Sequence, residues 1–191
     1  GLEMASRNAA DAQAMVDTAD GAYQEVTNML LRMREMAVQA VNGTLSNADR
    51  TALNTEMTAL EAEITKIADN TEFAGIDLGT SKAVTFQIGA GKDETIEHTF
   101  KDFDAANLSL ISSVATATAA ANTISVVDAA ISLVSTRRGE LGALSNRLSS
   151  TIANLDNIAV NLSSAKGRIQ DTDFASETSN LAKSQIMQQA A

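Results

Sequence analysis

The sequence has 191 residues and 45 % hydrophobic content, enough for one folded domain or two, and its net charge of −10 argues against a nucleic-acid-binding surface. The absence of cysteine excludes disulfides and thiolate chemistry. No stretch approaches the roughly 18 consecutive apolar residues of a membrane-spanning helix, and no signal peptide opens the chain.

The first predicted element is a helix over residues 2–41. The chain contains no proline, so the commonest helix breaker is absent. Apolar or small residues recur in steps of three and four, which predicts one face packed against partner helices: Ala19, Ala22, Val26, Met29, Met33, Met36 and Ala40. Asn42-Gly43 supplies the end of the helix, since both residues tolerate the left-handed conformation.

A second helix is predicted from Ser46 to about Asp69. Ser46 and Asp49 resemble a capping box with Asp in place of the usual Glu. The apolar positions form a heptad repeat of the coiled-coil type, at Leu53, Met57, Leu60, Ile64 and Ile67. The short connection between the two helices makes them antiparallel neighbours.

The hydrophobic period then changes to two. Residues 84–88 and 95–100 alternate apolar and polar side chains, and the Gly-rich segment 89–92 turns the chain between them, which predicts a β-hairpin. Residues 70–80 are expected to form a loop. Because an isolated hairpin is marginal in water, its apolar side chains are expected to pack on the helices: Val84, Phe86, Ile88, Ile96 and Phe100.

The rest of the chain is predicted to be a linker followed by one very long helix. Residues 109–123 are almost all Ser, Thr and Ala, which is typical of a linker or a weak helix. From residue 124 to 169 the apolar period predicts a helix of about 45 residues, close to 70 Å long. Its seam is Ile124, Val127, Ile131, Val134, Arg138, Leu141, Ser145, Leu148, Ile152, Leu155, Ala159, Leu162 and Ile169.

A seam of this length needs both N-terminal helices as partners, which would bring the two chain ends side by side. The predicted fold is therefore mainly α, an elongated antiparallel bundle of long helices with a small β-hairpin packed on it. One domain is expected over residues 1–191, with the two helices and the hairpin in 1–108 and the long helix and a following segment in 124–191. Both ends of the sequence look cut, because neither carries a helix cap or stop.

Several long stretches resemble bacterial flagellin. Residues 1–9 are similar to the start of the family's rod domain, and residues 31–40 (LRMREMAVQA) to its N-terminal signature. Residues 161–175 (NLSSAKGRIQDTDFA) and 185–190 (QIMQQA) resemble the C-terminal signature, and residues 85–90 are a family-like part of the hairpin. The likeness covers essentially the whole chain except the Ser/Thr/Ala stretch.

The resemblance implies a structural subunit of the flagellar filament that serves motility. Such a subunit is exported unfolded through a type III pathway and polymerises outside the cell. The implied partners are other flagellin subunits and the flagellar export and cap proteins. In the family, outer domains are inserted about where residues 109–123 lie, and terminal segments form an inner tube. This sequence resembles the rod domain alone, so the chain itself is expected to be monomeric.

The resemblance implies a second role, as a ligand of the Toll-like receptor that senses flagellin in animals. Arg32, Met36 and Glu56 match receptor-contact positions, and Glu35 lies on the same helical face. Leu31 stands where many stimulatory flagellins have Gln, and Met36 where they have Leu. All five are receptor-binding candidates. In the alternative interpretation, Arg32 and Glu35 form a solvated pair and Met36 packs inside the rod.

Arg137 and Arg138 are candidates for contact with a neighbouring subunit in the filament, with a solvated helix face as the alternative. The closest rival function is a hook–filament junction protein, which shares the terminal signatures. Polymerisation of the full-length protein onto filament seeds distinguishes the two.

No catalytic or metal site is predicted, and no cofactor. His98 is the only histidine, with no cysteine to complete a site, and the His-Glu-x-x-His pattern of metalloproteases is absent. Asp171 and Asp173 follow Gly167 and are interpreted as capping or turn residues at the end of the long helix. The chain is therefore not expected to be an enzyme.

Overall fold

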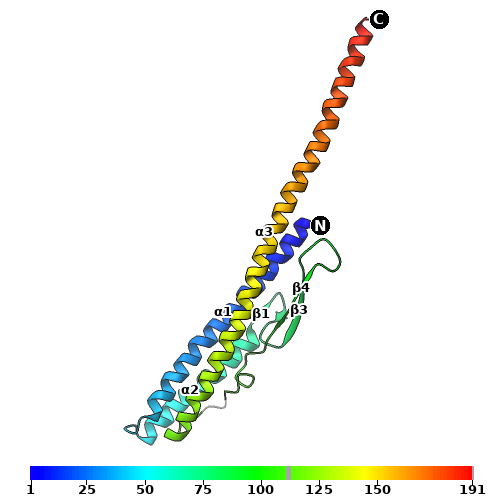
Figure 1. The fold of residues 1–191 in the computed structure, drawn as a ribbon. Coiled ribbons are helices and arrows are strands. Elements are labelled where there is room, and N and C mark those ends of the chain that lie inside the picture. The colour runs from blue at the N-terminus through cyan, green and yellow to red at the C-terminus, as the bar shows by residue number, and fades with distance from the viewer. Residues whose placement is uncertain (111–112, 191) are drawn as a thin grey trace.

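A computed structural model describes residues 1–110 and 113–190, and the side chains of all of these except 171–175 and 190. Three helices dominate: α1 (Leu2–Val41), α2 (Asn47–Asn70) and α3 (Ala117–Ala190). Two small antiparallel sheets lie between α2 and α3 in the chain. The molecule is an elongated rod from which the C-terminal part of α3 extends alone (Figure 1). The predicted class, a mainly α bundle with a small hairpin, is confirmed.

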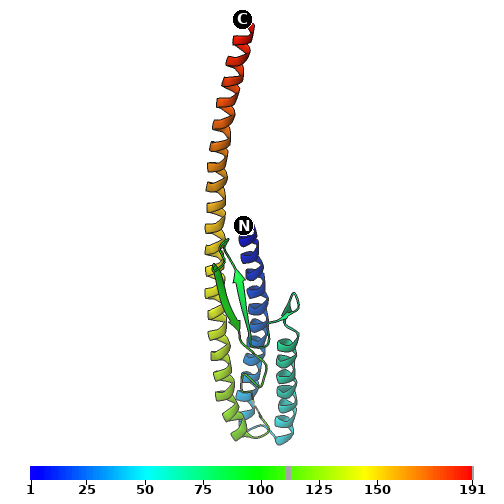
Figure 2. The same cartoon turned by 90° about the vertical axis from the view of Figure 1, so that its right-hand side faces the viewer.

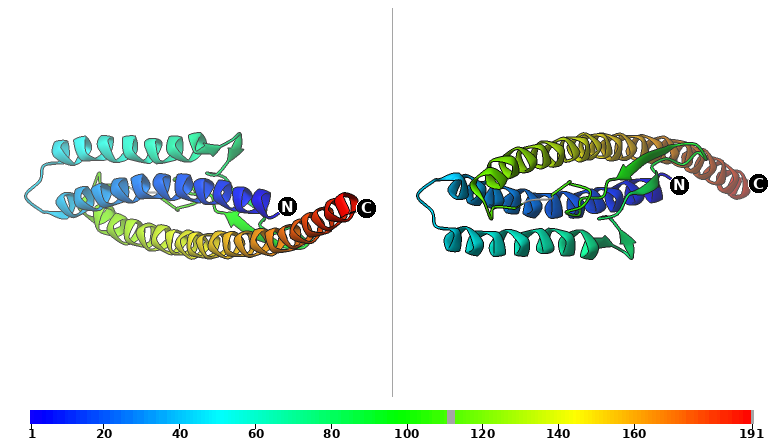
Figure 3. Two further views of the ribbon diagram at one scale, coloured as in Figure 1. Left: turned by 90° about the horizontal axis from the view of Figure 1, so that it is seen from above. Right: turned by 90° about the horizontal axis from the view of Figure 1, so that it is seen from below.

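The helix α1 lies between α2 and α3 and contacts both (Figures 2 and 3). It runs antiparallel to each of them. Its buried residues repeat every three or four positions on more than one face: Ala5, Ala9, Ala12, Met15, Val16, Ala19, Tyr23, Val26, Leu30, Met33, Met36, Ala37 and Ala40. Such a wide apolar surface is what a helix with neighbours on two sides requires.

The turn between α1 and α2 is closed by one buried arginine. The Arg50 side chain donates to the carbonyl oxygens of Ala40, Asn42 and Leu45, each at 2.9 Å. These carbonyls belong to the last turn of α1 and the connection after it, where no helical N–H remains to satisfy them. The predicted capping box is also present, with Ser46 and Asp49 bonded reciprocally at the start of α2.

The predicted loop over residues 70–80 contains a two-stranded sheet of β1 (Glu72–Phe73) and β2 (Ile76–Asp77). Strands this short give almost no periodic signal. The turn between them uses positive φ at Ala74 and Gly75. After β2, Asp77 Oδ1 accepts from the Gly79 N–H at 2.9 Å, and Gly79 packs directly on the Ala68 backbone in the last turn of α2.

The predicted hairpin is confirmed as β3 (Lys82–Gln87) paired with β4 (Thr95–Phe100). Its inward side chains pack as expected, with Phe86, Ile96 and Phe100 buried and Val84 and Ile88 partly buried against the core. Asn8 Nδ2 donates to the Gln87 carbonyl at 3.1 Å and ties the hairpin to α1.

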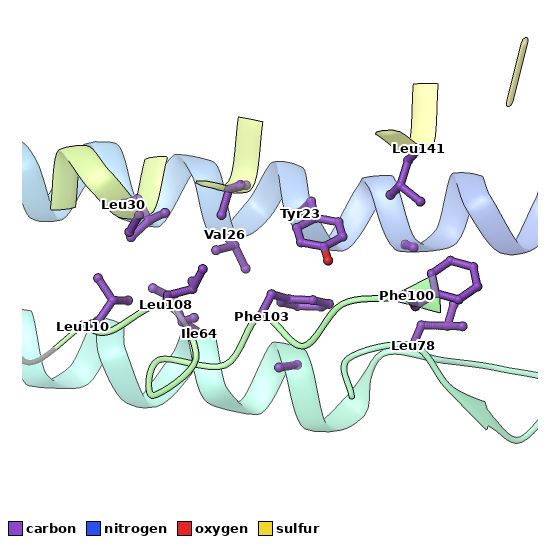
Figure 4. Packing of buried hydrophobic residues seen from close by; sticks show 14 of the residues in the cluster. Tyr23, Val26, Leu30, Ile64, Leu78, Phe100, Phe103, Leu108, Leu110 and Leu141 are labelled. Atoms are coloured by element: carbon purple, nitrogen blue, oxygen red, sulfur yellow. The ribbon is translucent and has the colours of Figure 1, made fainter. Parts of the chain in front are cut away.

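The segment between β4 and α3 is part of the core, which the sequence did not indicate. Phe103, Leu108, Leu110 and Val114 are buried, and Figure 4 shows the first three between α1 and α2. The Phe103 ring lies 4.5 Å from that of Tyr23. The helix α3 packs on α1, which lies between it and α2, so the expectation that α3 packs on both N-terminal helices is wrong.

Tyr23 donates its hydroxyl to the Lys101 carbonyl at 2.7 Å, and burial raises its pKa to about 12. In the unfolded chain the pKa is near 10, so the folded state keeps a proton that the unfolded state loses. Stability should therefore fall as pH rises from about 10 to 12, by up to about 2 kcal/mol.

This prediction is checked by the tyrosinate absorbance, which reports Tyr23 directly because the chain has no other tyrosine and no tryptophan. Denaturant unfolding across the same pH range, compared with Tyr23→Phe, isolates the energetic effect from lysine titration. A titration midpoint near 10 in the folded protein would contradict the prediction.

The helix α3 differs from its prediction at both ends. It begins at Ala117, so the second half of the stretch predicted as a linker or weak helix is helical, with Ala120 and Thr123 buried. Thr123 Oγ1 donates to the Ser113 carbonyl and Asn54 Oδ1 accepts from the Val114 N–H, which fixes the entry into the helix. Alanine is the strongest helix former, and here tertiary contacts supplement it.

At the other end α3 continues without a stop to Ala190. Asp171 and Asp173 lie inside the helix, so their interpretation as turn or capping residues is wrong. The predicted seam is buried at Val127, Val134, Leu141, Leu148 and Leu155. Its C-terminal members, Leu162 and Ile169, are 61 % and 68 % exposed because they lie beyond the N-terminal end of α1. The two chain ends are therefore not side by side (Figure 1).

Candidate functional site

The candidate receptor surface gathers one arginine and two glutamates from α1 and α2. Arg32 on α1 donates to Glu56 Oε1 on α2, through Nη2 at 2.8 Å and Nε at 3.0 Å. Its Nη1 also donates to Glu35 Oε2, at 3.4 Å. Hydrogen bonding to Glu56 raises the pKa of Arg32. All three side chains are about half exposed or more, so the cluster presents oriented charges to solvent.

The other two receptor candidates have opposite environments. Leu31 is 47 % exposed beside this cluster, whereas Met36 is fully buried in the rod. Arg32 and Met36 are one turn apart, but Arg32 lies on the exposed side of α1 and Met36 on the buried side. Met36 therefore packs inside the rod, which is the alternative interpretation given for it from the sequence. The exposed set is Leu31, Arg32, Glu35 and Glu56.

Four polar pairs connect α1 to α3 along the rod. Their α1 members are spaced by seven residues or twice seven, which keeps them on one edge of the helix. From the N-terminal end of α1 they are Ser6–Asp156, Gln13–Ser145, Asp20–Arg138 and Arg34–Asp128, at 3.1, 2.6, 2.8 and 2.6 Å. Polar groups at such spacing define the register between two helices whose apolar seams alone would tolerate sliding.

Both filament-contact candidates are engaged within the subunit. Arg138 donates through Nε and Nη2 to the two carboxylate oxygens of Asp20, and this hydrogen bonding raises its pKa. Arg137 donates from Nη1 to the Asp102 carbonyl in the segment that leads to Phe103. The two arginines thus connect α3 to α1 and to the core segment.

Apolar side chains on several faces of the distal part of α3 are exposed to solvent. Beyond Leu155, none of the α3 side chains that the structure describes is buried. The large apolar members are Ile158, Val160, Leu162, Ile169, Leu181, Ile186 and Met187. The sequence predicted Leu162 and Ile169 as part of an apolar seam. Only the structure shows that α1 does not extend alongside them.

His98 lies on β4, with its ring 5.0 Å from Phe100 in an edge-on arrangement, and burial lowers its pKa. Within residues 1–110 and 113–190, no group of three or more His, Asp or Glu side chains is placed to hold a metal ion.

One part of α3, residues 117–170, is long and apolar enough by composition to cross a membrane, although it has no 18 consecutive apolar residues. Val127 and Val134 within it are fully buried, and Asp128 pairs with Arg34. These residues belong to the part of α3 that packs on α1.

Comparison with known proteins agrees with this architecture. Residues 1–79 match the family model of the bacterial flagellin N-terminal helical region, and residues 124–191 match that of the bacterial flagellin C-terminal helical region. A flagellin of Halalkalibacterium halodurans is 40 % identical over 199 residues, which cover all of this chain and 72 % of that protein. Flagellin D of Vibrio anguillarum is 30 % identical, covering all of this chain and 79 % of that protein.

The fold also matches those of solved flagellar proteins. The crystal structure of Bacillus cereus flagellin matches with a TM-score of 0.71 and 30 % identity, over 84 % of this chain and 94 % of that one. A putative flagellar hook-associated protein from Vibrio parahaemolyticus has a TM-score of 0.72 at 14 % identity, over 87 % of this chain and 90 % of that one, which shows a shared fold alone. The chain belongs to the bacterial flagellin family, whose members are structural subunits of the flagellar filament.

Proposed function

We propose that this protein polymerises with copies of itself through the part of α3 that extends beyond α1. The observation that carries the proposal is the set of exposed apolar side chains between Ile158 and Met187, of which Ile158, Leu162 and Ile169 continue the buried seam of α3 along one face. Exposed apolar side chains in such number mark an interaction surface, and a helix without a partner gains little from its own hydrogen bonds. Export through a type III pathway and contacts with export and cap proteins belong to the same proposal, by resemblance to the family.

Filament assembly tests this proposal. The native protein with Leu162→Asp and Ile169→Asp should fold with an unchanged thermal midpoint, because both side chains are more than half exposed. Its elongation of filament fragments should be abolished, since each charge would be desolvated at the subunit contact. Ser163→Asp with Ser164→Asp adds the same two charges at exposed polar positions, so it is the matched control and should elongate normally. Normal elongation by the double variant would refute the proposal.

The hook–filament junction protein is the rival function. It would share the same rod and the same exposed apolar side chains, so the fold does not separate the two. The 40 % identity to a flagellin, against 14 % to a putative hook-associated protein, favours the filament subunit. Addition of the native protein to filament seeds decides the matter, because a junction protein would bind the end without extending it.

We also propose that Leu31, Arg32, Glu35 and Glu56 form the surface recognised by the flagellin-sensing Toll-like receptor. Support comes from the resemblance of these positions to the family's receptor contacts and from the exposure of all four side chains. The ion pairs of Arg32 hold its guanidinium in one orientation, which lowers the entropy lost on binding. For Arg138 we propose an indirect role in the filament, through the register of α3 against α1, and for Arg137 one through its bond to the Asp102 carbonyl.

Arg32→Ala should reduce receptor signalling by roughly tenfold or more, as expected for an arginine at the centre of a contact surface. The thermal midpoint should be almost unchanged, because the ion pair with Glu56 is exposed. The measurement is a dose–response curve in receptor-expressing reporter cells. Lys66→Ala, which removes another exposed α2 ion pair, is the control and should leave the curve in place. An identical curve for Arg32→Ala would exclude this surface.

A further inference from the structure

Asn42 and Gly43 form the only Asn-Gly pair in the sequence, at the exposed turn that follows α1. A glycine offers an unhindered backbone nitrogen to the side chain before it. In such a pair the Gly nitrogen loses its proton to hydroxide and attacks Cγ of Asn. A C–N bond forms, the side-chain nitrogen leaves as ammonia, and water opens the resulting succinimide to Asp or isoAsp. Asparagine is accordingly one of the thermolabile residues.

The conformation of Asn42 opposes this ring closure. The five-membered ring requires the Gly43 nitrogen to lie over Cβ of Asn42, eclipsed about the Cα–C bond. At the observed ψ of 124° the nitrogen is turned well away from Cβ. Closure therefore requires a large rotation of ψ, and that rotation moves the Asn42 carbonyl oxygen together with the Gly43 nitrogen.

That carbonyl is held by the same arginine that closes the turn. The Asn42 carbonyl accepts from Arg50 Nη2 at 2.9 Å and from the Leu45 N–H at 3.2 Å. Asn42 Oδ1 accepts from the Thr44 N–H at 3.1 Å, which restrains the side chain as well. Arg50 itself is 7 % exposed and also donates to the Ala40 and Leu45 carbonyls. Its side chain therefore cannot move with the Asn42 carbonyl unless those two hydrogen bonds break.

We propose that Asn42–Gly43 is a latent site of spontaneous deamidation, and that Arg50 keeps it unreactive by fixing the Asn42 carbonyl. Reaction takes place only from the fraction of molecules in which this hydrogen bond has opened. Each event places a carboxylate at the negative pole of α1, and the isoAsp product adds a backbone atom to the turn. Deamidation thus weakens the connection between α1 and α2.

The test is the rate of ammonia loss at Asn42, followed by peptide mass spectrometry and isoAsp detection at mildly alkaline pH and 37 °C. The folded native chain should deamidate about tenfold or more slowly than a free peptide of residues 38–47 in the same buffer. Arg50→Lys keeps the charge but loses the planar fork, so it should deamidate several times faster than the native chain. Circular dichroism verifies that this variant is folded under the same conditions.

Gly43→Ala is the matched control, because a Cβ at this position meets nothing within 4 Å and so should not disturb the fold. Combined with Arg50→Lys, it should suppress the accelerated reaction. A native chain that reacts as fast as the peptide would overturn the proposal, and that comparison does not depend on any variant. A folded Arg50→Lys protein that reacts at the native rate would also overturn it, since the turn would then be held without Arg50.

Discussion

Gly79→Ala should destabilise the protein by about 3 kcal/mol, which corresponds to a fall of roughly 10 °C in Tm for a chain of this size. The reason is direct contact between two backbones. A Cβ added at Gly79 would lie 1.8 Å from the Ala68 carbonyl oxygen and 2.5 Å from its carbonyl carbon. Neither atom belongs to a flexible side chain, so the segment after β2 must move away from α2.

Thermal and urea unfolding of this variant provide the measurement. Gly43→Ala serves as the matched control because its Cβ has open space, and it should change Tm by no more than a degree or two. The lower stability of Gly79→Ala should be accompanied by faster hydrogen exchange in β1, β2 and the last turn of α2, because these elements depend on this contact. Equal stability of the two variants would mean that the approach of Gly79 to α2 does not matter energetically.

Phe103→Ala should destabilise the protein by about 3–5 kcal/mol, the range measured for large aromatic residues in cores. Phe103 is fully buried, packs against the Tyr23 ring at a tilt of 46° and lies between α1 and α2 (Figure 4). Its removal leaves a cavity between two long helices that also contact each other directly, so the site has little scope to collapse.

Two comparisons make the measurement specific. Tyr23→Phe keeps the ring contact and removes only the hydroxyl bonded to the Lys101 carbonyl, so it should cost about 1 kcal/mol. Leu162→Ala removes an exposed apolar side chain and should be almost neutral in the monomer. If Phe103→Ala were as mild as Leu162→Ala, the segment from β4 to α3 would not be part of the core.

Most of the secondary structure followed from the sequence because its causes are local. The C-terminal end of α1, the capping box of Ser46 and Asp49, and the hairpin all depend on residues close together in the chain. The left-handed conformation expected at Asn42 and Gly43 is wrong, however, because Asn42 is extended, with φ −61° and ψ 124°. The short strands β1 and β2 were missed because two residues give no period. The end of α3 was misplaced because Gly167 was interpreted as a stop, although a single glycine inside a helix costs only about 1 kcal/mol.

The sites were predicted less completely, and the misses have one cause. The spacing of Arg32, Glu35 and Met36 put them on neighbouring parts of α1, but it did not say which part faces a partner. Arg137 and Arg138 gave no sign of their acceptors on Asp102 and Asp20, which are 35 and 118 residues away. The buried Arg50 carried no periodic signal, because its role depends on three carbonyls of a turn.

The sequence by itself determined that this protein is built from long helices and a hairpin, with apolar seams at helical spacing, because propensity and patterning act within a few residues. Only the tertiary structure decided which seams have partners. Burial depends on what lies across from a side chain, so Met36 is enclosed and Leu31 is not, although both lie on α1. For the same reason the apolar seam of α3 is buried as far as Leu155 and exposed beyond it, past the N-terminal end of α1.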